Sequence, residues 1–596
     1  MAPKQAAERV PVKTPDPAKL ADAWTSVLVN GTEAIRAATE RSMVAPAAAP
    51  YDPLAPMRAF SDFTKSLWSN PAGLMETQHK LFAEWTELWT GGVGRASGQV
   101  SDPVLVPEKG DRRFNDSAWN QGFFDYLKQA YLLTTRQSME TIAKTDLDPA
   151  TRTRVDFYAR QFLNAISPAN FVFSNPEAIQ QAMESGGVSL LGGLANLLED
   201  AASPSGLVTR RSADNFEVGG TIAATPGGII FQNEMMQLIH YKATTAEVYR
   251  RPLLYIPPLV NKFYILDLQP KSSMIRWLVE QGHDVFVISW VNPGPELSSK
   301  GIGDYCLEGP VAALRIIERL TGERSVDVFG FCMGGTLAAI TAAYLSAAGE
   351  ANRVGSLSMI GTLLDFTDTG EWATFYEDGQ MDAFERYAQE TGVVSADKLQ
   401  ALFSVVRAND LIWASVVNHY LLDREAPASD LLFWFADGSR LPQALLVEYG
   451  KELLRGNRLK EHGGISVGNA PIDLAAIKAP ACMISLKDDH VSGWRATYAG
   501  ARLFGGETMF MLGGSGHNAG LISLRLSNRH GYWINEDLPE APEQWFDGAV
   551  QKTGSWWPAW QEWLASHHGE KVPARPLGSD ELPVIEAAPG SYVMVK

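Results

Sequence analysis

Cys332 lies in the segment GFCMGG (330–335), and its position in this segment predicts a nucleophile. The apolar run 325–331 before it is typical of a strand, and the run 333–348 after it is typical of a helix. A G-x-C-x-G segment at a strand-to-helix turn corresponds to the nucleophile elbow of α/β-hydrolases, with sulfur in place of the usual serine oxygen. The N-terminus of the following helix favours a thiolate at this position. The alternative is a glycine-rich turn that carries an inert, buried cysteine.

An acid and a base follow Cys332 in the chain order that this type of site requires. The apolar runs 481–486 and 507–512 are predicted strands, and each ends in a polar turn. The first turn is Lys487-Asp488-Asp489-His490, and the second is Gly513-Gly514-Ser515-Gly516-His517. Open α/β sheets place their sites at such strand ends. We therefore predict a triad of Cys332, His517 and one of the two aspartates, because spacing alone does not separate Asp488 from Asp489. His490 is a candidate for a supporting contact.

This set of side chains predicts acyl transfer. His517 would take the proton of Cys332, and the thiolate would attack an ester or thioester carbonyl. The backbone N–H of Met333 is placed to bind the developing oxyanion. A cysteine exchanges one thioester for another at little energetic cost, which favours acyl-CoA chemistry over simple ester hydrolysis. The other two cysteines, Cys306 and Cys482, are interpreted as small buried apolar residues.

Composition excludes several other classes of protein. The net charge of −17 makes nucleic acid an unexpected partner, because phosphate binding requires a cationic face. Three cysteines cannot form a disulfide framework, and they suit a reducing cytoplasm. The N-terminus shows no apolar signal segment, and no apolar run approaches the ~18 residues that a membrane span needs. No cluster has zinc-ligand spacing and no GxxxxGK(S/T) phosphate-binding loop is present.

The elements that must position these residues fall in the second part of the chain. A length of 596 residues predicts more than one domain. We expect a disordered N-terminus over 1–18, a helical domain over 19–215, and an α/β catalytic domain over 216–596, in which strands alternate with helices. An aromatic stripe runs from Phe60 to Trp89 at helical spacing. It predicts either packing within the helical domain or a surface that docks on an apolar phase or a partner helix.

From about Asp111 to the C-terminus the chain resembles the class I polyhydroxyalkanoate synthases, the poly-3-hydroxybutyrate polymerases. The blocks that carry the resemblance are DRRFNDSAW, SPANFVFSNPEA, ESGGVSLLGGLANLLED, FQNEMMQL, PPLVNKFYILDLQP, VEQGHDVFVISWVNP, GFCMGGT, LLDFTDTG, NDLIW, DLLFW, DDHVSGW, SGHNAG and GSWWPAWQEWL. The resemblance implies an α/β-hydrolase fold, with Cys332 as the acyl carrier and His517 as the base. It selects Asp489, which would orient His517, activate the 3-hydroxyl of the acceptor, or do both. It also implies Val260 as a second oxyanion donor beside Met333.

The same resemblance implies an inserted lid over about 364–442 that shields the active site from water. It implies (R)-3-hydroxyacyl-CoA as substrate, with 3-hydroxybutyryl-CoA as the expected unit, and a polyester product on a cytoplasmic granule. A homodimer and phasin-type granule proteins are the implied partners, and no cofactor is implied because the CoA thioester is itself the activated substrate. Two positions, Phe435 after DLLFW and Gly493 in DDHVSGW, depart from the family pattern.

Overall fold

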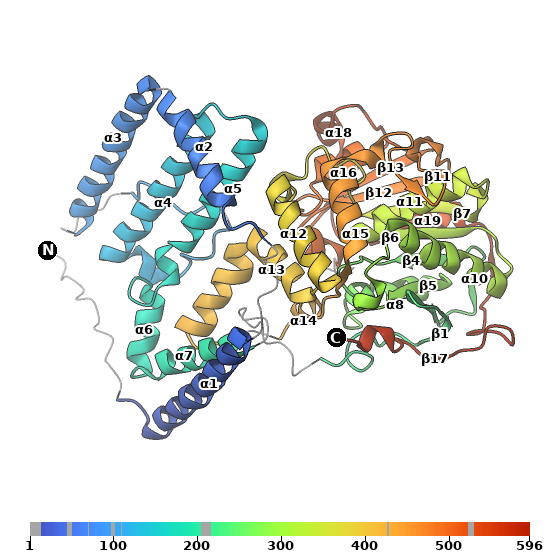
Figure 1. Ribbon diagram of the computed structural model, residues 1–596, viewed down its shortest axis with the longest axis horizontal. Coiled ribbons are helices and arrows are strands. Elements are labelled where there is room, and N and C mark those ends of the chain that lie inside the picture. The colour runs from blue at the N-terminus through green and yellow to red at the C-terminus, as the bar shows by residue number, and fades with distance from the viewer. Residues whose placement is uncertain are drawn as a thin grey trace. The chain divides into compact units, whose positions relative to one another are not determined.

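The computed structural model describes residues 14–43, 51–69, 71–96, 102–108, 110–203, 216–425, 428–522 and 530–596. The chain forms two compact units, drawn in Figure 1. One unit comprises Met1–Pro46, Asp52–Arg211 and Ala401–Pro427, and the other comprises Ala47–Tyr51, Ser212–Gln400 and Ala428–Lys596. The disorder predicted for 1–18 falls mostly outside the described residues, and the first helix begins within that stretch, at Pro17.

The first unit is helical. Its helices are α1 (Pro17–Met43), α2 (Ala55–Ser69), α3 (Pro71–Ala96), α4 (Gly122–Lys144), α5 (Pro149–Ala165), α6 (Pro176–Glu184) and α7 (Val188–Ala202). Local sequence sets where α5 and α6 begin. Asp148 and Asn175 accept hydrogen bonds from the first-turn N–H groups, and a proline follows each of them. Helix α1 packs along α7, where the Asn30 amide donates to the carbonyl of Ala195 at 2.9 Å.

The segment Ala401–Pro427 groups with the helical unit, whereas the sequence placed it within the catalytic domain. Polar contacts tie it there: the Tyr420 hydroxyl donates to Asp200 at 2.7 Å, and the Asn409 amide donates to Asn164 at 2.9 Å. Gly193 of α7 lets the backbone of Tyr420 come close, since a Cβ at this glycine would lie 2.0 Å from the Tyr420 carbonyl oxygen. The expected lid over 364–442 is therefore shared between the two units. Helix α13 (Ala396–Val406) spans the boundary.

The aromatic stripe of α2 and α3 is divided between packing and exposure. Phe60 and Phe63 pack on a core cluster with Ile142 and Val155, and Leu88 is fully buried. By contrast, Trp68, Phe82 and Trp89 are exposed. Packing explains part of the pattern, and the exposed part stays available for the alternative interpretation, a docking surface.

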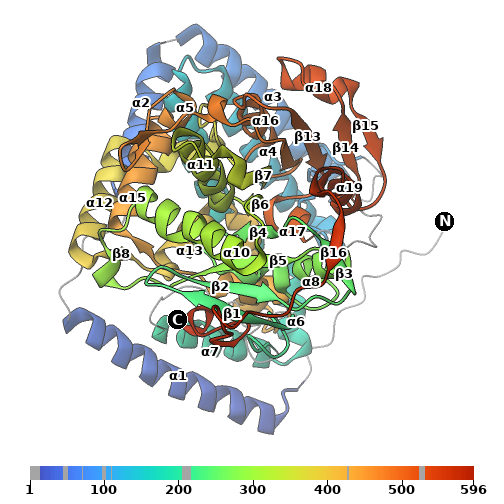
Figure 2. The ribbon, with the colours of Figure 1, turned by 90° about the vertical axis from the view of Figure 1, so that its right-hand side faces the viewer.

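The second unit is built on one mixed sheet of eleven strands, in the order β15-β14-β13-β12-β7-β6-β4-β5-β2-β1-β17. The parallel strands at its centre are β4 (Leu253–Ile256), β5 (Val285–Trp290), β6 (Val326–Phe331), β7 (Val354–Ile360), β12 (Ala481–Leu486) and β13 (Thr508–Gly513). Of these, β6, β12 and β13 confirm the strands predicted from the apolar runs 325–331, 481–486 and 507–512. Antiparallel strands extend both edges: β1 (Gly227–Gln232), β2 (Met236–Tyr241) and β17 (Glu586–Ala587) on one side, and β14 (Tyr532–Asn535) and β15 (Val550–Lys552), seen beside β13 in Figure 2, on the other.

Helices flank this sheet, as expected for strands that are apolar on both faces. They are α8 (Met274–Glu280), α9 (Ile302–Cys306), α10 (Ala312–Thr321), α11 (Met333–Ala347), α12 (Asp378–Thr391), α14 (Asp430–Ala436), α15 (Gln443–Glu448), α16 (Trp494–Ala501), α17 (His517–Leu521), α18 (Pro542–Gly548) and α19 (Trp557–His568). All residues of β5, β6 and β12 are buried. Among the described residues, no helix combines the length and the hydropathy that a membrane crossing requires.

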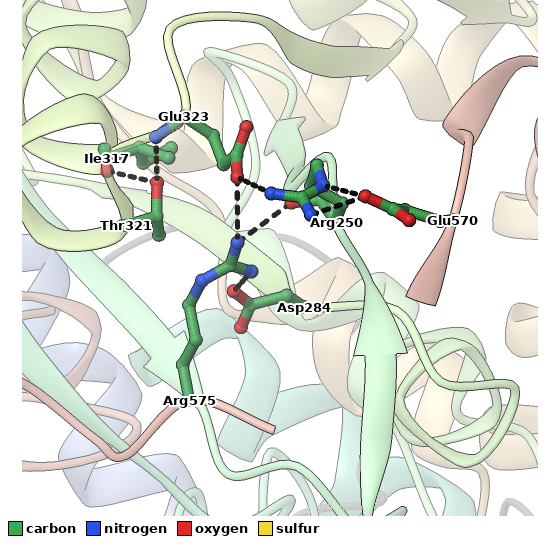
Figure 3. Close-up of polar contacts among 7 residues, drawn as sticks. All are labelled: Arg250, Asp284, Ile317, Thr321, Glu323, Glu570 and Arg575. Carbon is green, nitrogen blue, oxygen red and sulfur yellow. Dashed lines mark hydrogen bonds and ion pairs between the residues drawn. The ribbon is translucent and has the colours of Figure 1, made fainter. Parts of the chain in front are cut away.

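A network of ion pairs fastens the C-terminal segment to this unit at the pair β3 (Glu247–Tyr249) and β16 (Lys571–Pro573). Figure 3 shows Arg575 between Asp284 and Glu323, with Arg250 between Glu323 and Glu570. Arg575 donates to Asp284 at 2.8 Å and to the carbonyl of Arg250 at 2.9 Å. The Asp284 side chain is only 2% exposed, whereas that of Arg250 is 47% exposed.

Replacing Arg575 with methionine is expected to destabilise the catalytic unit by about 3 kcal/mol, because it leaves the Asp284 carboxylate buried with one cationic partner fewer. A loss of this size lowers the melting temperature of a unit this large by roughly 4 °C, which differential scanning fluorimetry at pH 7 would detect. The matched control is Arg250→Met, which removes exposed ion pairs and is expected to cost less than about 1 kcal/mol. Equal losses in the two variants would contradict this assignment.

Candidate active site

Cys332 is the single residue between the end of β6 and the start of α11, and its backbone conformation is strained. Its φ of 54° and ψ of −128° are rarely adopted by residues other than glycine. Strand pairing and the helix hold it there: Cys332 N donates to the Ile360 carbonyl at 3.0 Å, and Gly335 N donates to the Cys332 carbonyl at 2.9 Å. This is the geometry of the predicted elbow, and the partly buried sulfur follows directly from it.

The glycines around Cys332 are required by close backbone approach. A Cβ at Gly334 would lie 2.2 Å from the Ile256 carbonyl oxygen and 2.5 Å from that of Pro257, and a Cβ at Gly330 would lie 2.5 Å from the Gly334 carbonyl oxygen. Since carbonyl oxygens of the backbone cannot rotate away, β4, β6 and α11 can meet here only without side chains. The GxCxG spacing thus reflects packing as well as chemistry.

Gly334→Ala is expected to destabilise the protein by about 3 kcal/mol or more, because the added methyl group overpacks a rigid backbone contact. The melting temperature and the yield of soluble protein measure this loss. Gly303→Ala on α9 is the matched control, since a Cβ there meets nothing within 4 Å. The control is expected to leave the melting temperature unchanged or slightly higher. A Gly334→Ala protein as stable as the control would refute the packing argument.

Asp489 and His517 meet at the ends of the neighbouring parallel strands β12 and β13. The imidazole Nδ1 lies 2.6 Å from Asp489 Oδ2, and both side chains are buried. The other carboxylate oxygen of Asp489 accepts hydrogen bonds from the N–H groups of Val491 at 2.7 Å and Ser492 at 2.8 Å. Asp488 is exposed. The geometry therefore pairs His517 with Asp489, which spacing alone left undecided.

The electrostatics of His517 connect it to Cys332. Burial disfavours the charged imidazole, but the Asp489 carboxylate and the charge and hydrogen bond of Cys332 outweigh this effect and raise the pKa of His517 to about 10. The ring also lies 4.7 Å from that of Phe331, the last residue of β6. Cys332, His517 and Asp489 thus form one connected set in which a proton can pass from sulfur to imidazole.

The other predicted site residues lie around this set. Met333 is the first residue of α11, where a helical N–H has no acceptor within the helix. Val260 is buried in the loop after β4, and its carbonyl accepts from Ser439 N at 3.1 Å. His490 contacts the inserted segment through its backbone, because its carbonyl accepts the indole N–H of Trp372 at 3.1 Å.

Sequence analysis missed two sets of residues beside the site. Trp556 and Trp557, at the start of α19, donate their indole N–H groups to the carbonyls of Gly520 and Leu521 at 3.0 and 3.1 Å, and so hold the short helix that begins with His517. Tyr255 and Tyr449 lie close enough to Cys332 that its negative charge adds to the effect of burial in raising the pKa of each phenol. The tryptophan pair in GSWWPAW was visible in the sequence as an unusual cluster, whereas nothing in the local sequence marked the tyrosines.

A small apolar pocket adjoins the N-terminus of α11. Leu259, Met333, Thr336 and Tyr449 are among the residues that line it. Leu259 precedes Val260 and Met333 follows Cys332, so the pocket lies next to both positions of the site. Among the described residues, no group of His, Cys, Asp and Glu side chains has the arrangement of a metal site.

Comparison with known proteins finds two family models that match parts of this chain. Residues 110–278 match the family model described as the N-terminus of poly-beta-hydroxybutyrate polymerase (PhaC), and residues 252–523 match the model of the alpha/beta hydrolase fold. The second match confirms the predicted fold class. The poly(3-hydroxyalkanoate) polymerase of Methylorubrum extorquens is 38% identical over 544 residues, which cover 90% of each chain. The poly(3-hydroxyalkanoate) polymerase subunit PhaC of Cupriavidus necator is 37% identical over 534 residues, which cover 88% of this chain and 89% of the relative.

Proposed function

Because this chain belongs to the family of poly(3-hydroxyalkanoate) polymerases, we propose that it joins (R)-3-hydroxyacyl-CoA units into a polyester through an acyl group carried on Cys332. Short units such as 3-hydroxybutyryl-CoA are the proposed substrate, and free CoA is the second product. The observation that carries the proposal is the buried pair of His517 and Asp489 beside a sulfur held at a strained elbow.

The first half-reaction loads the enzyme. His517 accepts the proton of Cys332, and the thiolate adds to the thioester carbonyl of the substrate. The oxyanion that forms is stabilised by the N–H groups of Met333 and Val260. The tetrahedral adduct then expels the CoA thiolate, which takes the proton from the imidazolium, and the acyl group stays on the sulfur as a new thioester. One thioester is broken and one is formed, so the acyl group keeps its activation.

The second half-reaction extends the polymer. The 3-hydroxyl of an acceptor loses its proton to His517, or to Asp489 acting with it, and attacks the acyl-Cys332 carbonyl. The resulting ester leaves the sulfur, which recovers the proton as a thiol. Apolar residues beside Met333 and the inserted segment support this step, since water reaching the acyl-enzyme would hydrolyse it. No metal or redox cofactor takes part in this scheme, because the thioester supplies the driving force.

Because the proposed polyester product is insoluble in water, the location of the enzyme in the cell can also be proposed. We propose that it acts in the cytoplasm at the surface of polymer granules, as a homodimer, with phasin-type granule proteins as neighbours. Large exposed apolar side chains of the helical unit support adhesion to such a surface; examples are Phe82, Phe123, Phe162 and Phe173. Sedimentation of the protein with newly formed polymer, compared with protein lacking substrate, would test this placement.

The decisive experiment follows CoA release from (R)-3-hydroxybutyryl-CoA by purified protein, with turbidity and recovered polyester measured in the same reaction. We expect CoA and polymer to appear together. CoA release with only free 3-hydroxybutyrate would mean that water is the acceptor and that the protein is a thioesterase. If neither product forms, longer 3-hydroxyacyl-CoA substrates decide between a different chain length and an inactive scaffold.

A further inference from the structure

The loop that carries Val260 is fastened by a buried lysine two residues further on. The Lys262 ammonium donates to Asp437 Oδ1 and to the carbonyl of Val593, each at 2.7 Å, and its side chain is 5% exposed. Burial lowers the pKa of Lys262, and the Asp437 carboxylate opposes this shift. A buried ammonium is tolerated only while such partners stay in place. The loop is therefore tied at one point to the segment around Asp437 and to the C-terminal tail.

The segment around Asp437 forms several further hydrogen bonds with the same loop. The second oxygen of Asp437 accepts the Tyr264 hydroxyl at 2.7 Å, and the Trp434 indole donates to the carbonyl of Lys262 at 2.8 Å. Ser439 N donates to the carbonyl of Val260. The backbone on both sides of Val260 to Lys262 therefore has little freedom to rotate.

The C-terminal tail completes the arrangement. Val593 is buried in the core of the catalytic unit, so its carbonyl is held in place for Lys262. The last residues are fixed separately: Asn292 donates to the carbonyl of Val595 at 3.2 Å, and Arg440 donates to that of Lys596 at 2.5 Å. The Arg440 side chain thus donates to the tail at Lys596 and to the carbonyl of Pro293.

We propose that Lys262 is a positioning residue for acyl transfer: through Asp437 and the Val593 carbonyl it holds the loop so that the Val260 N–H meets the oxyanion. The inference rests on the proposed acyl transfer and on Val260 as a donor. An oxyanion donor acts only at the correct distance, and removing one costs about 10²–10³ in rate. A donor that is loosened rather than removed is expected to lose part of this effect. Ground-state binding of the substrate does not use this contact, so KM should change little.

The test compares Lys262→Met with wild type in three measurements: kcat and KM for CoA release, the melting temperature, and the rate at which iodoacetamide alkylates Cys332. Alkylation uses the thiolate but forms no oxyanion. We expect kcat to fall by about 10–100-fold, with KM and the alkylation rate within about threefold of wild type. Arg440→Met, which loosens the tail but leaves Lys262 and its partners in place, is the matched control and is expected to keep its kcat within about threefold.

Several results would overturn the inference. One is a kcat for Lys262→Met within threefold of wild type, and another is an equal fall in the alkylation rate, which would mean that the whole site is disturbed. Equal kcat losses in Lys262→Met and Arg440→Met would assign the effect to tail stability. If Lys262→Met does not fold, Asp437→Asn replaces it under the same criteria. Failure of the wild-type protein to release CoA would count against the proposed function instead.

Discussion

Replacing Cys332 with alanine is expected to lower the rate of CoA release by about 10⁴-fold or more, because the variant lacks the thiol that attacks the substrate and carries the acyl group. Polymer formation should stop with it. With a radiolabelled acyl-CoA, wild-type protein should retain label after denaturation and the variant should not. Cys332→Ser, which keeps the elbow but offers a weaker nucleophile, should also be strongly impaired and should bind label as an ester.

Cys306→Ala provides the matched control for this experiment. Cys306 is fully buried, and burial raises the pKa of its thiol to about 12, so it is neither accessible nor ionised at neutral pH. The control should retain its activity and its acyl label, at a modest cost in stability. Retention of a tenth or more of the activity by Cys332→Ala would show that another residue is the nucleophile.

Asp489→Asn is expected to lower kcat by about 10³–10⁴-fold, the scale seen when the acid of a catalytic triad is replaced by its amide. The amide removes the negative charge that raises the pKa of His517 towards 10. Because a raised pKa keeps the imidazolium protonated up to that pH, loss of the charge lets the proton leave at lower pH. The alkaline limb of the residual kcat/KM profile should therefore move to lower pH, which a profile between pH 6 and 10.5 would reveal.

Asp488→Asn is the matched control, since this neighbour is exposed and should change kcat by less than about twofold. A similar loss in both variants would contradict the pairing of His517 with Asp489. Separate measurement of the first CoA burst and of steady elongation adds a further distinction. An Asp489 that only orients His517 should slow both phases alike, whereas one that activates the acceptor hydroxyl should slow elongation more.

The shifted pKa of His517 also makes the free energy of unfolding depend on pH. His517 has a folded-state pKa raised above its unfolded value of about 6.5. Its contribution to stability is therefore fully present below pH ~6.5 and is lost as the pH rises towards 10. His283 behaves in the opposite sense, because burial lowers its pKa to about 3. Its contribution is complete above pH ~6.5 and declines as the medium becomes more acidic.

The elements that carry the chemistry could be predicted from short stretches of sequence. Apolar runs bounded by polar turns predicted β6, β12 and β13, because buried parallel strands need apolar side chains on both faces. The GxCxG segment predicted the elbow, because its glycines are required wherever backbones meet that closely. Chain order then predicted that Cys332, an aspartate and His517 share one edge of the sheet. These are local signals, and each is readable within about ten residues.

Contacts between segments that are far apart in the chain became visible only in the folded structure. Spacing left Asp488 and Asp489 undecided and the family resemblance favoured Asp489, but the contact itself depends on which carboxylate faces His517 across two strands. The reassignment of Ala401–Pro427 to the helical unit depends on partners in α5 and α7 more than 200 residues away. The fastening of the Val260 loop by Lys262 joins the tail to a loop 331 residues earlier. Hydrogen bonds and burial of this kind leave no periodic pattern in the sequence, because their partners are selected by the packing of the folded chain.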